Sequence, residues 1–203
     1  MSSTSGAVGS RVPQLEGAGK VSGAIRYTHD IALPGMLFAA VLRSPHPHAR
    51  IVSIDVAPAL AVEGVCDAVV ATDFPDRKYI NLGPAYADRY PMARGVVRFV
   101  GEEVAAVAAS SPEAARAGIE AIRVVFDPLP AAVTVDEALA PGAPQVHPDK
   151  PGLGPNLAQA VDVRFGDVDA AMASAHLVVR GTFEHGIVWP VCLETNAAVA
   201  AFD

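Results

Sequence analysis

Two histidines, His46 and His48, stand two residues apart in the stretch SPHPH. Imidazoles at this spacing could bind one metal ion or transfer a proton, because histidine is a common metal ligand and titrates near neutral pH. A metal site needs further ligands, and no third ligand is evident from the sequence. Pro45 and Pro47 favour extended or turn geometry around the pair. We therefore expect a structural corner between two strands rather than a metal centre.

Two adjacent carboxylates, Glu102 and Glu103, follow Gly101 where the sequence indicates a tight bend between strands. Neighbouring residues of a strand point to opposite faces, so these two groups cannot easily share a proton as an acid/base dyad. We expect one of them to be buried and hydrogen-bonded. A structural role is favoured over a catalytic one.

A third carboxylate, Glu194, lies in the stretch CLETN. Its sequence neighbours predict burial, and burial of an unpaired charge is very costly; these neighbours are Val191, Leu193, Ala197 and Val199. Glu194 then needs a partner, which we expect to be backbone or a companion chain.

The two cysteines, Cys66 and Cys192, also stand among apolar residues. No second thiol is near either one in sequence, so they indicate neither a disulfide framework nor a cysteine cluster. We expect both to be inert buried thiols. His185 and Trp189 could line a substrate entrance, although packing is the favoured interpretation.

The composition excludes several classes of function. The chain has 203 residues, 51% of them hydrophobic, and a net charge of -7 without a block of basic residues. Nucleic-acid binding and binding to an acidic membrane surface are therefore not expected. No apolar run approaches the roughly 20 residues of a membrane span, and no signal peptide is recognised, which predicts a soluble cytoplasmic protein. The nucleotide-binding patterns GxGxxG and GxxxxGK[ST] are absent.

The N-terminal two thirds of the chain must position the paired histidines and glutamates. Residues 35–44 form a continuous apolar run that predicts a strand buried on both faces. The elements expected after it are an alternating strand at 49–56, a short helix at 57–65, a strand at 66–72, an irregular loop at 73–94, and two strands within 96–110 that meet at Gly101.

The clearest helix signal begins at Ser111, an N-cap followed by proline and glutamate. Its apolar face is expected at Ala114, Ala117, Ile119 and Ile122. A strand at 123–130 follows, and this order of strand, helix and strand favours an α/β layer with one crossover helix.

The composition changes to Pro, Gly, Asp and Ala between residues 134 and 155, which predicts a linker and a domain boundary near 135. Beyond it the expected elements are a strand at 157–166, a helix capped by Asp167, a strand at 176–186, and a final apolar stretch at 192–203.

Four blocks of sequence resemble one family, the molybdenum hydroxylases of the xanthine dehydrogenase and aldehyde oxidase type. In chain order they are GKVSGAIRYTHDIALPGMLFAAVLRSPHPHARIVSIDVAPALAVEGV, VRFVGEEVAAVAASSPEAARAGIEAIRVVFDPLPAAVTVDEAL, RFGDVDAAMASAHLVVRGTFEHG and LETNAAVAAFD. They follow the family's order and spacing and cover the chain from residue 19 to its end.

The resemblance implies an α+β fold, the α/β hammerhead with mixed sheets, followed by the incomplete start of a molybdopterin-binding α+β domain. The expected divisions are a flexible N-terminus at 1–18, the hammerhead domain at 19–135, a linker at 136–155, and the beginning of the molybdopterin-binding domain at 156–203. Glu194 and Glu102 become candidates for hydrogen bonding around the molybdenum pocket.

The family's chemistry implies an oxidoreductase that hydroxylates an aldehyde or an N-heterocycle with oxygen from water. It further implies a molybdopterin-type molybdenum cofactor, a small-molecule substrate, and partner subunits carrying 2Fe-2S clusters and FAD, besides the remainder of the molybdenum-binding subunit.

The chain departs from the family in length. The glycine-rich GQG-type loops that hold the pterin and the late glutamate that acts as general base have no counterpart here. We therefore expect no catalytic residue and no metal ligand in this chain, which would be either one product of a natural gene split or a truncated product. The alternative function is a non-catalytic protein-interaction module that reuses the hammerhead fold.

Overall fold

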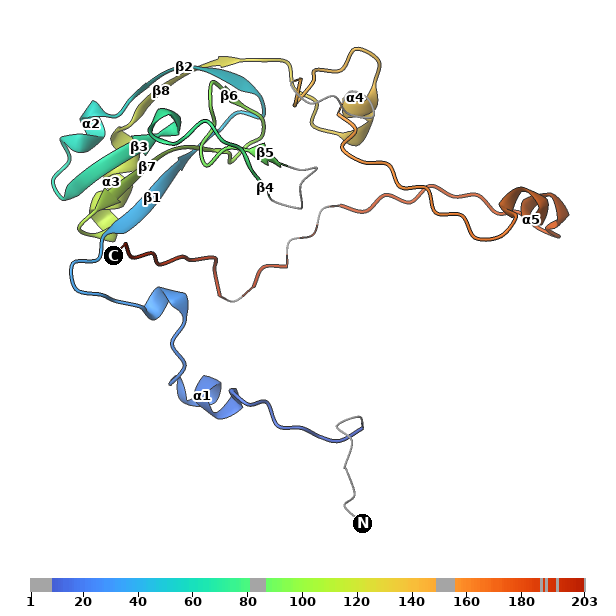
Figure 1. Ribbon diagram of the computed structural model, residues 1–203, viewed down its shortest axis with the longest axis horizontal. Helices are drawn as coiled ribbons and strands as arrows, with labels where there is room; N and C mark the ends of the chain where they lie inside the picture. Colours follow the sequence, from blue (N-terminus) through green and yellow to red (C-terminus); the bar gives the residue numbers. More distant parts are fainter. Residues whose placement is uncertain are drawn as a thin grey trace. The chain divides into compact units, whose positions relative to one another are not determined.

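The computed structural model describes residues 9–80, 87–148, 156–186, 188, 190–192 and 194–202 (Figure 1). The chain divides into two units. The main unit is Met36–His176, and the terminal unit combines Met1–Gly35 with Leu177–Asp203.

The first sheet of the main unit has three strands in the order β1-β7-β3. These are β1 (Phe38–Arg43), β7 (Glu103–Ala109) and β3 (Val65–Val70), and both pairings are antiparallel. After Glu103, the central strand β7 consists only of alanine and valine, whose small side chains leave room for an element to pack closely on the face of the sheet. Its inward side chains Ala105, Val107 and Ala109 are buried and form the centre of the main core.

Helix α3 (Pro112–Ala121) packs against this sheet. The Ser111 side chain caps it by accepting a hydrogen bond from the Ala114 N–H at 3.1 Å, as the sequence predicts. Of the expected apolar face, Ile122 is buried and Ala114 and Ile119 pack against the core, which confirms the prediction for these three, whereas Ala117 is exposed. The buried residues within the helix are Ala115 and Gly118. A Cβ at Gly118 would lie 2.9 Å from Val65 Cγ2, which shows how closely the helix approaches the sheet.

The second sheet has the order β6-β2-β8, again with antiparallel pairings. Its strands are β6 (Val96–Val97), β2 (Ala49–Asp55) and β8 (Arg123–Pro128). A smaller core lies here, made of the buried residues Ala49, Ala93, Val97 and Val104. Between β2 and β3 the short helix α2 (Ala57–Leu60) ends earlier than the predicted span of 57–65.

The segment 73–94, expected to be an irregular loop, begins in the 3-10 turn η2 (Ala71–Asp73) and contains a small antiparallel pair. This pair is β4 (Tyr79–Ile80) with β5 (Ala87–Arg89). The prediction of a wholly irregular loop is therefore wrong in part.

The α+β class is confirmed, but the described ladders are antiparallel where mixed sheets were expected. The predicted helix is present as α3, but its predicted role as a crossover is wrong. The strands that flank it in sequence, β7 and β8, belong to different sheets. A parallel crossover requires both strands in one sheet.

Strand β1 does not have the two buried faces that its apolar run predicts. Its residues are exposed or half-buried, with 36% of Phe38 and 37% of Val41 accessible to solvent. An apolar run specifies burial only where something covers both faces, and α3 packs on one face of this sheet.

Two helices of the main unit follow β8. Helix α4 (Val135–Leu139) lies at the start of the expected linker and has a capping box formed by Thr134 and Glu137. Helix α5 (Val168–Ser174) is capped by Asp167, as predicted. The predicted strand at 157–166 is wrong, because no ladder involves these residues in the described part of the chain.

The terminal unit contains α1 (Gly17–Ser22) and the 3-10 turn η1 (Thr28–Asp30). A hydrogen bond between His29 Nε2 and Thr195 Oγ1 joins its two segments. Residues 177–186, predicted as part of a strand, have no assigned strand. Across the part of the chain that the structure describes, no helix is long and apolar enough to cross a membrane. The domain boundaries proposed from the sequence stay predictions.

Candidate functional site

The corner predicted at the paired histidines is confirmed, since β1 ends at Arg43 and β2 begins at Ala49. Buried Ser44 organises it, because its Oγ accepts a hydrogen bond from the His46 N–H at 3.0 Å. The Ser44 N–H donates to the Glu102 carbonyl at 2.9 Å, and the Gly101 N–H donates to the Ser44 carbonyl at 2.8 Å. The histidine corner is thereby joined to the bend that carries both glutamates.

The two imidazoles have separate surroundings. The His46 ring lies edge-on to Phe126, with ring centroids 5.1 Å apart. His48 Nδ1 lies 2.6 Å from the Pro130 carbonyl oxygen. Within the residues that the structure describes, no group of three His, Cys, Asp or Glu side chains could hold a metal ion. Both rings therefore serve to fasten the corner to β8 and the segment after it.

We call residues 98–103 the Gly101 turn. It connects β6 to β7, and Gly101 itself adopts a φ of 94°, a backbone conformation that favours glycine. Glu102 is buried, with only 10% of its side chain exposed. Its carboxylate accepts a hydrogen bond from the Arg98 N–H, and the Arg98 guanidinium lies 3.9 Å away. The prediction that one glutamate is buried and hydrogen-bonded is confirmed.

Burial raises the pKa of Glu102, and the hydrogen bond and charge of Arg98 only partly offset this effect. Arg98 is itself held in place, because its Nη1 donates to the Val96 carbonyl at 3.2 Å and its Nε to the Val146 carbonyl at 3.2 Å. The buried Glu102 carboxylate therefore holds the Gly101 turn closed through its contacts with Arg98.

Glu103 has different partners. Its Oε1 accepts a hydrogen bond from Arg43 at 2.7 Å, and its Oε2 accepts one from Arg89 at 3.0 Å. Partial burial acts to raise the pKa of Glu103, but its own backbone N–H and the two arginines outweigh it and lower that pKa. The Arg89 guanidinium also lies 5.1 Å from the centre of the Phe99 ring. Both carboxylates thus have partners, and their pKa values are shifted in opposite directions, upward for Glu102 and downward for Glu103.

A second polar cluster, not anticipated from the sequence, fixes the start of the segment 73–94. Arg94 Nη2 donates to the carbonyls of Ala71 and Phe74 at 2.8 and 3.0 Å. Its guanidinium lies over the Tyr90 ring, 5.4 Å from the centroid. The pKa of Tyr90 is raised, mainly by its hydrogen bond to Asp76 and to a smaller extent by burial. The only signal for this cluster was the frequency of Arg, Asp and Tyr in a supposed loop.

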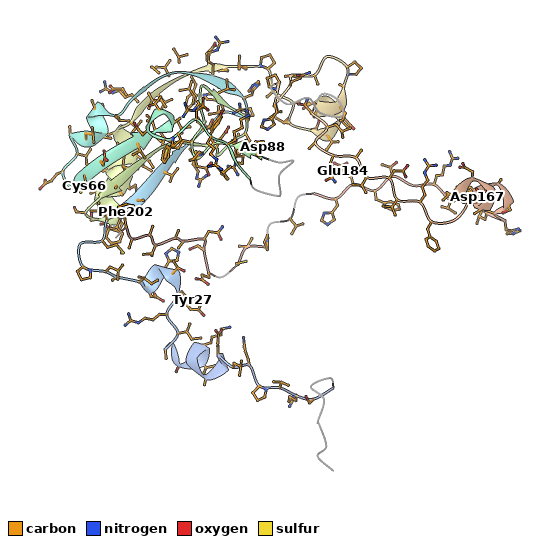
Figure 2. All side chains as sticks on the ribbon, in the orientation of Figure 1. Tyr27, Cys66, Asp88, Asp167, Glu184 and Phe202 are labelled. Carbon is orange, nitrogen blue, oxygen red and sulfur yellow. The ribbon has the colours of Figure 1, made fainter. Side chains whose placement is uncertain are left out.

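The other candidates are not buried as predicted. Glu194 is exposed, and so are both cysteines, with Cys66 lying on β3 at the sheet (Figure 2). Apolar neighbours in sequence cannot bury a side chain where no second layer covers the segment. His185 is exposed, while Trp189 lies outside the described residues.

The small antiparallel sheets, the helix packed on one of them and the Gly101 turn define an α+β hammerhead-type fold. The family described as aldehyde oxidase and xanthine dehydrogenase, a/b hammerhead domain, matches residues 22–130. This range is more than half of the chain, and the chain therefore belongs to the molybdenum hydroxylase family. It corresponds to the hammerhead region of the family's large subunit.

Individual relatives agree with this assignment. The chain is 32% identical over 193 residues to the nicotinate dehydrogenase large molybdopterin subunit of Eubacterium barkeri, a match covering 95% of this chain and 43% of that protein. It is 29% identical over 206 residues to the nicotine 6-hydroxylase large subunit of Paenarthrobacter nicotinovorans, covering 98% of this chain and 25% of that protein. The chain spans less than half the length of these relatives.

A solved structure shares the fold. Reconstituted CO dehydrogenase from Oligotropha carboxidovorans superimposes with a TM-score of 0.61 at 33% sequence identity. The match covers 70% of this chain and 18% of that one. The family assignment made from the four sequence blocks is confirmed.

Proposed function

We propose that this chain is a piece of a molybdenum hydroxylase that hydroxylates an aldehyde or an N-heterocycle, taking the oxygen atom from water. Its partners would be the remainder of the molybdenum-binding subunit, an iron-sulfur subunit with 2Fe-2S clusters and an FAD subunit. Electrons would leave through those subunits, and the complex would act in the cytoplasm. The observation that carries the proposal is the hammerhead match over residues 22–130, together with relatives named as large subunits of such enzymes.

The cofactor of this complex would be a molybdopterin-type molybdenum cofactor. In the described ranges, no group of three His, Cys, Asp or Glu side chains is placed to ligate a metal ion directly. The glutamates of the Gly101 turn are occupied by arginines and backbone N–H groups. We therefore propose that the cofactor is held mainly by polypeptide outside this chain.

The contribution of this chain would be structural. Glu102 holds the Gly101 turn closed, and that turn fixes the histidine corner through Ser44. We propose that Glu102 acts on the molybdenum pocket only through the position of this turn. Glu194 is exposed, and we propose that it finds its hydrogen-bond partner on the companion polypeptide.

The test is affinity purification of this chain from its native host, with metal analysis and identification of the subunits that co-purify. The proposal expects molybdenum and iron in a complex that contains iron-sulfur and flavin subunits. A stable complex that lacks both metals would contradict it and favour the alternative, a non-catalytic interaction module that shares the hammerhead fold.

A further inference from the structure

Residues 160–165 of the main unit, AVDVRF, have the pattern of a strand that is half buried, yet nothing in the described chain buries it. Their apolar side chains stand at every second position, and their exposed fractions are 72% for Val161, 84% for Val163 and 98% for Phe165. Disordered segments are typically poor in such bulky apolar residues. The segment therefore has a composition suited to an interface.

The two polar residues between them lie on one side of the backbone. Arg164 Nε lies 3.1 Å from Asp162 Oδ2, although the residues are two apart in sequence. Residues at i and i+2 meet in this way on the same face of an extended strand. The segment thus has one charged face and one apolar face.

The backbone of this segment is also unused. Among the described residues, no strand ladder and no backbone hydrogen bond involves 160–165. Figure 1 shows it as an extended run that leads into α5. Unpaired N–H and C=O groups beside an apolar face are a template for pairing with another strand.

We infer that residues 160–165 add as a strand to a sheet of the large subunit's remaining part, which lies outside these 203 residues; this inference rests on the proposed function. The relatives favour that occupant. The nicotinate dehydrogenase subunit matches 95% of this chain, but the match covers only 43% of the relative's own length. Such proteins therefore carry further polypeptide beyond the region that they share with this chain.

Strand addition makes a specific demand on the backbone. The N–H groups of alternate residues point to the same edge of a strand, so a partner on one edge protects every second amide. The side chains of Val161, Val163 and Phe165 would pack beneath the new neighbour, while Asp162 and Arg164 stay in water. A merely apolar contact would not produce alternating protection.

The first experiment is hydrogen exchange at single-residue resolution on the full chain, alone and with the remaining part of the subunit supplied as a separate co-expressed polypeptide. Alone, the amides of 160–165 should exchange freely while those of β7 are protected. In the complex, alternate amides from 161 to 165 should become protected. Uniformly fast exchange in a complex that contains molybdenum would overturn the inference and leave the proposed function standing.

The second experiment compares the two faces of the segment. Val163→Ser and Phe165→Ser should each weaken binding of that polypeptide by about tenfold or more, because each removes buried apolar surface. Arg164→Ser, on the charged face, should change the affinity by less than about twofold. Unchanged exchange protection of β7 in all three variants shows that the hammerhead stays folded. Equal effects of the three substitutions would overturn the inference.

Two further results would overturn the choice of occupant. One is alternate protection that appears in the isolated chain as its concentration rises, which would identify a second copy as the partner. The other is protection by a polypeptide from a complex without molybdenum, which would also remove the proposed function.

Discussion

Arg43 at the end of β1 and Glu103 at the start of β7 lie opposite each other in the first sheet, with Nη1 of the arginine 2.7 Å from Oε1 of the glutamate. The same Nη1 donates to the Gly101 carbonyl at 2.8 Å. Arg89 of β5 binds the other carboxylate oxygen at 3.0 Å. Glu103 of β7 therefore links β1 to β5, and Arg43 also joins β1 to the Gly101 turn.

Replacing this carboxylate tests the link. Glu103→Gln should lower the free energy of unfolding by about 1 kcal/mol, because it removes the charge from two partly exposed ion pairs. Urea unfolding followed by circular dichroism measures the loss. Glu120→Gln, at an exposed position of α3, is the control and should change stability by less than about 0.5 kcal/mol. Equal losses in both variants would contradict a specific role for Glu103.

The neighbouring glutamates should give opposite pH dependences. The pKa of Glu103 is lowered in the folded protein, so its contribution is present above the unfolded value near 4.5 and is lost as the pH falls through the folded pKa. The pKa of Glu102 is raised, so stability declines as the pH rises from 4.5 through the folded pKa.

The measurement is the unfolding free energy of the wild type, Glu102→Gln and Glu103→Gln between about pH 3 and pH 7. As the pH rises, Glu103→Gln should become less stable relative to the wild type, and Glu102→Gln should become more stable relative to it. Parallel curves for the two variants would refute the assignment.

The cap of α3 can be tested with a neighbouring residue as control. Ser111→Ala removes the acceptor of the Ala114 N–H and should cost about 1 kcal/mol of stability. Ser110→Ala, at the adjacent exposed serine, should cost less than about 0.5 kcal/mol. Thermal unfolding of both variants measures the difference, and a Ser110 effect as large as that of Ser111 would argue against the cap.

The close approach of α3 to the first sheet depends on Gly118. Gly118→Leu should destabilise the protein by about 1–3 kcal/mol, since its side chain would be forced against Val65 and Val107, and this outweighs the better helix propensity of leucine. Ala117→Leu, one residue away on the exposed side, should be tolerated. Denaturant midpoints that are unchanged in both variants would show that the sheet can move aside.

Local signals in the sequence predicted the elements that local chemistry determines. The Ser111 cap, the strand at 49–56 and the glycine bend at 101 each depend on a few neighbouring residues, and each is present in the structure. The alternation predicted for the strand is wrong, because its register shifts between Ile51 and Ser53 and Val52 is exposed. The capping box of Thr134 and Glu137 was an equally local signal, but the proline-rich composition of the region obscured it. The sequence predicted that one of the two adjacent glutamates is buried, and the buried one is Glu102, which lies in the Gly101 turn just before β7.

The errors concern features that depend on distant contacts. A strand exists only with a partner, and the apolar patterns at 157–166 and 176–186 contain no information about whether one is present. The same reason accounts for Glu194, Cys66 and Cys192, which were placed in a core from their neighbours alone. The arginine cluster at Arg94 joins groups up to 23 residues apart, which spacing rules cannot anticipate.

The position of β7 between β1 and β3 has a consequence for synthesis on the ribosome. Arg43 meets a residue 60 positions later, so β1 emerges long before the strand that pairs with it. At a translation speed of roughly 5–20 residues per second, the backbone N–H and C=O groups of β1 lack their partner strand for about 3–12 s until β7 has been synthesised. Nascent chains of this protein should therefore engage a chaperone until residue 109 has left the exit tunnel.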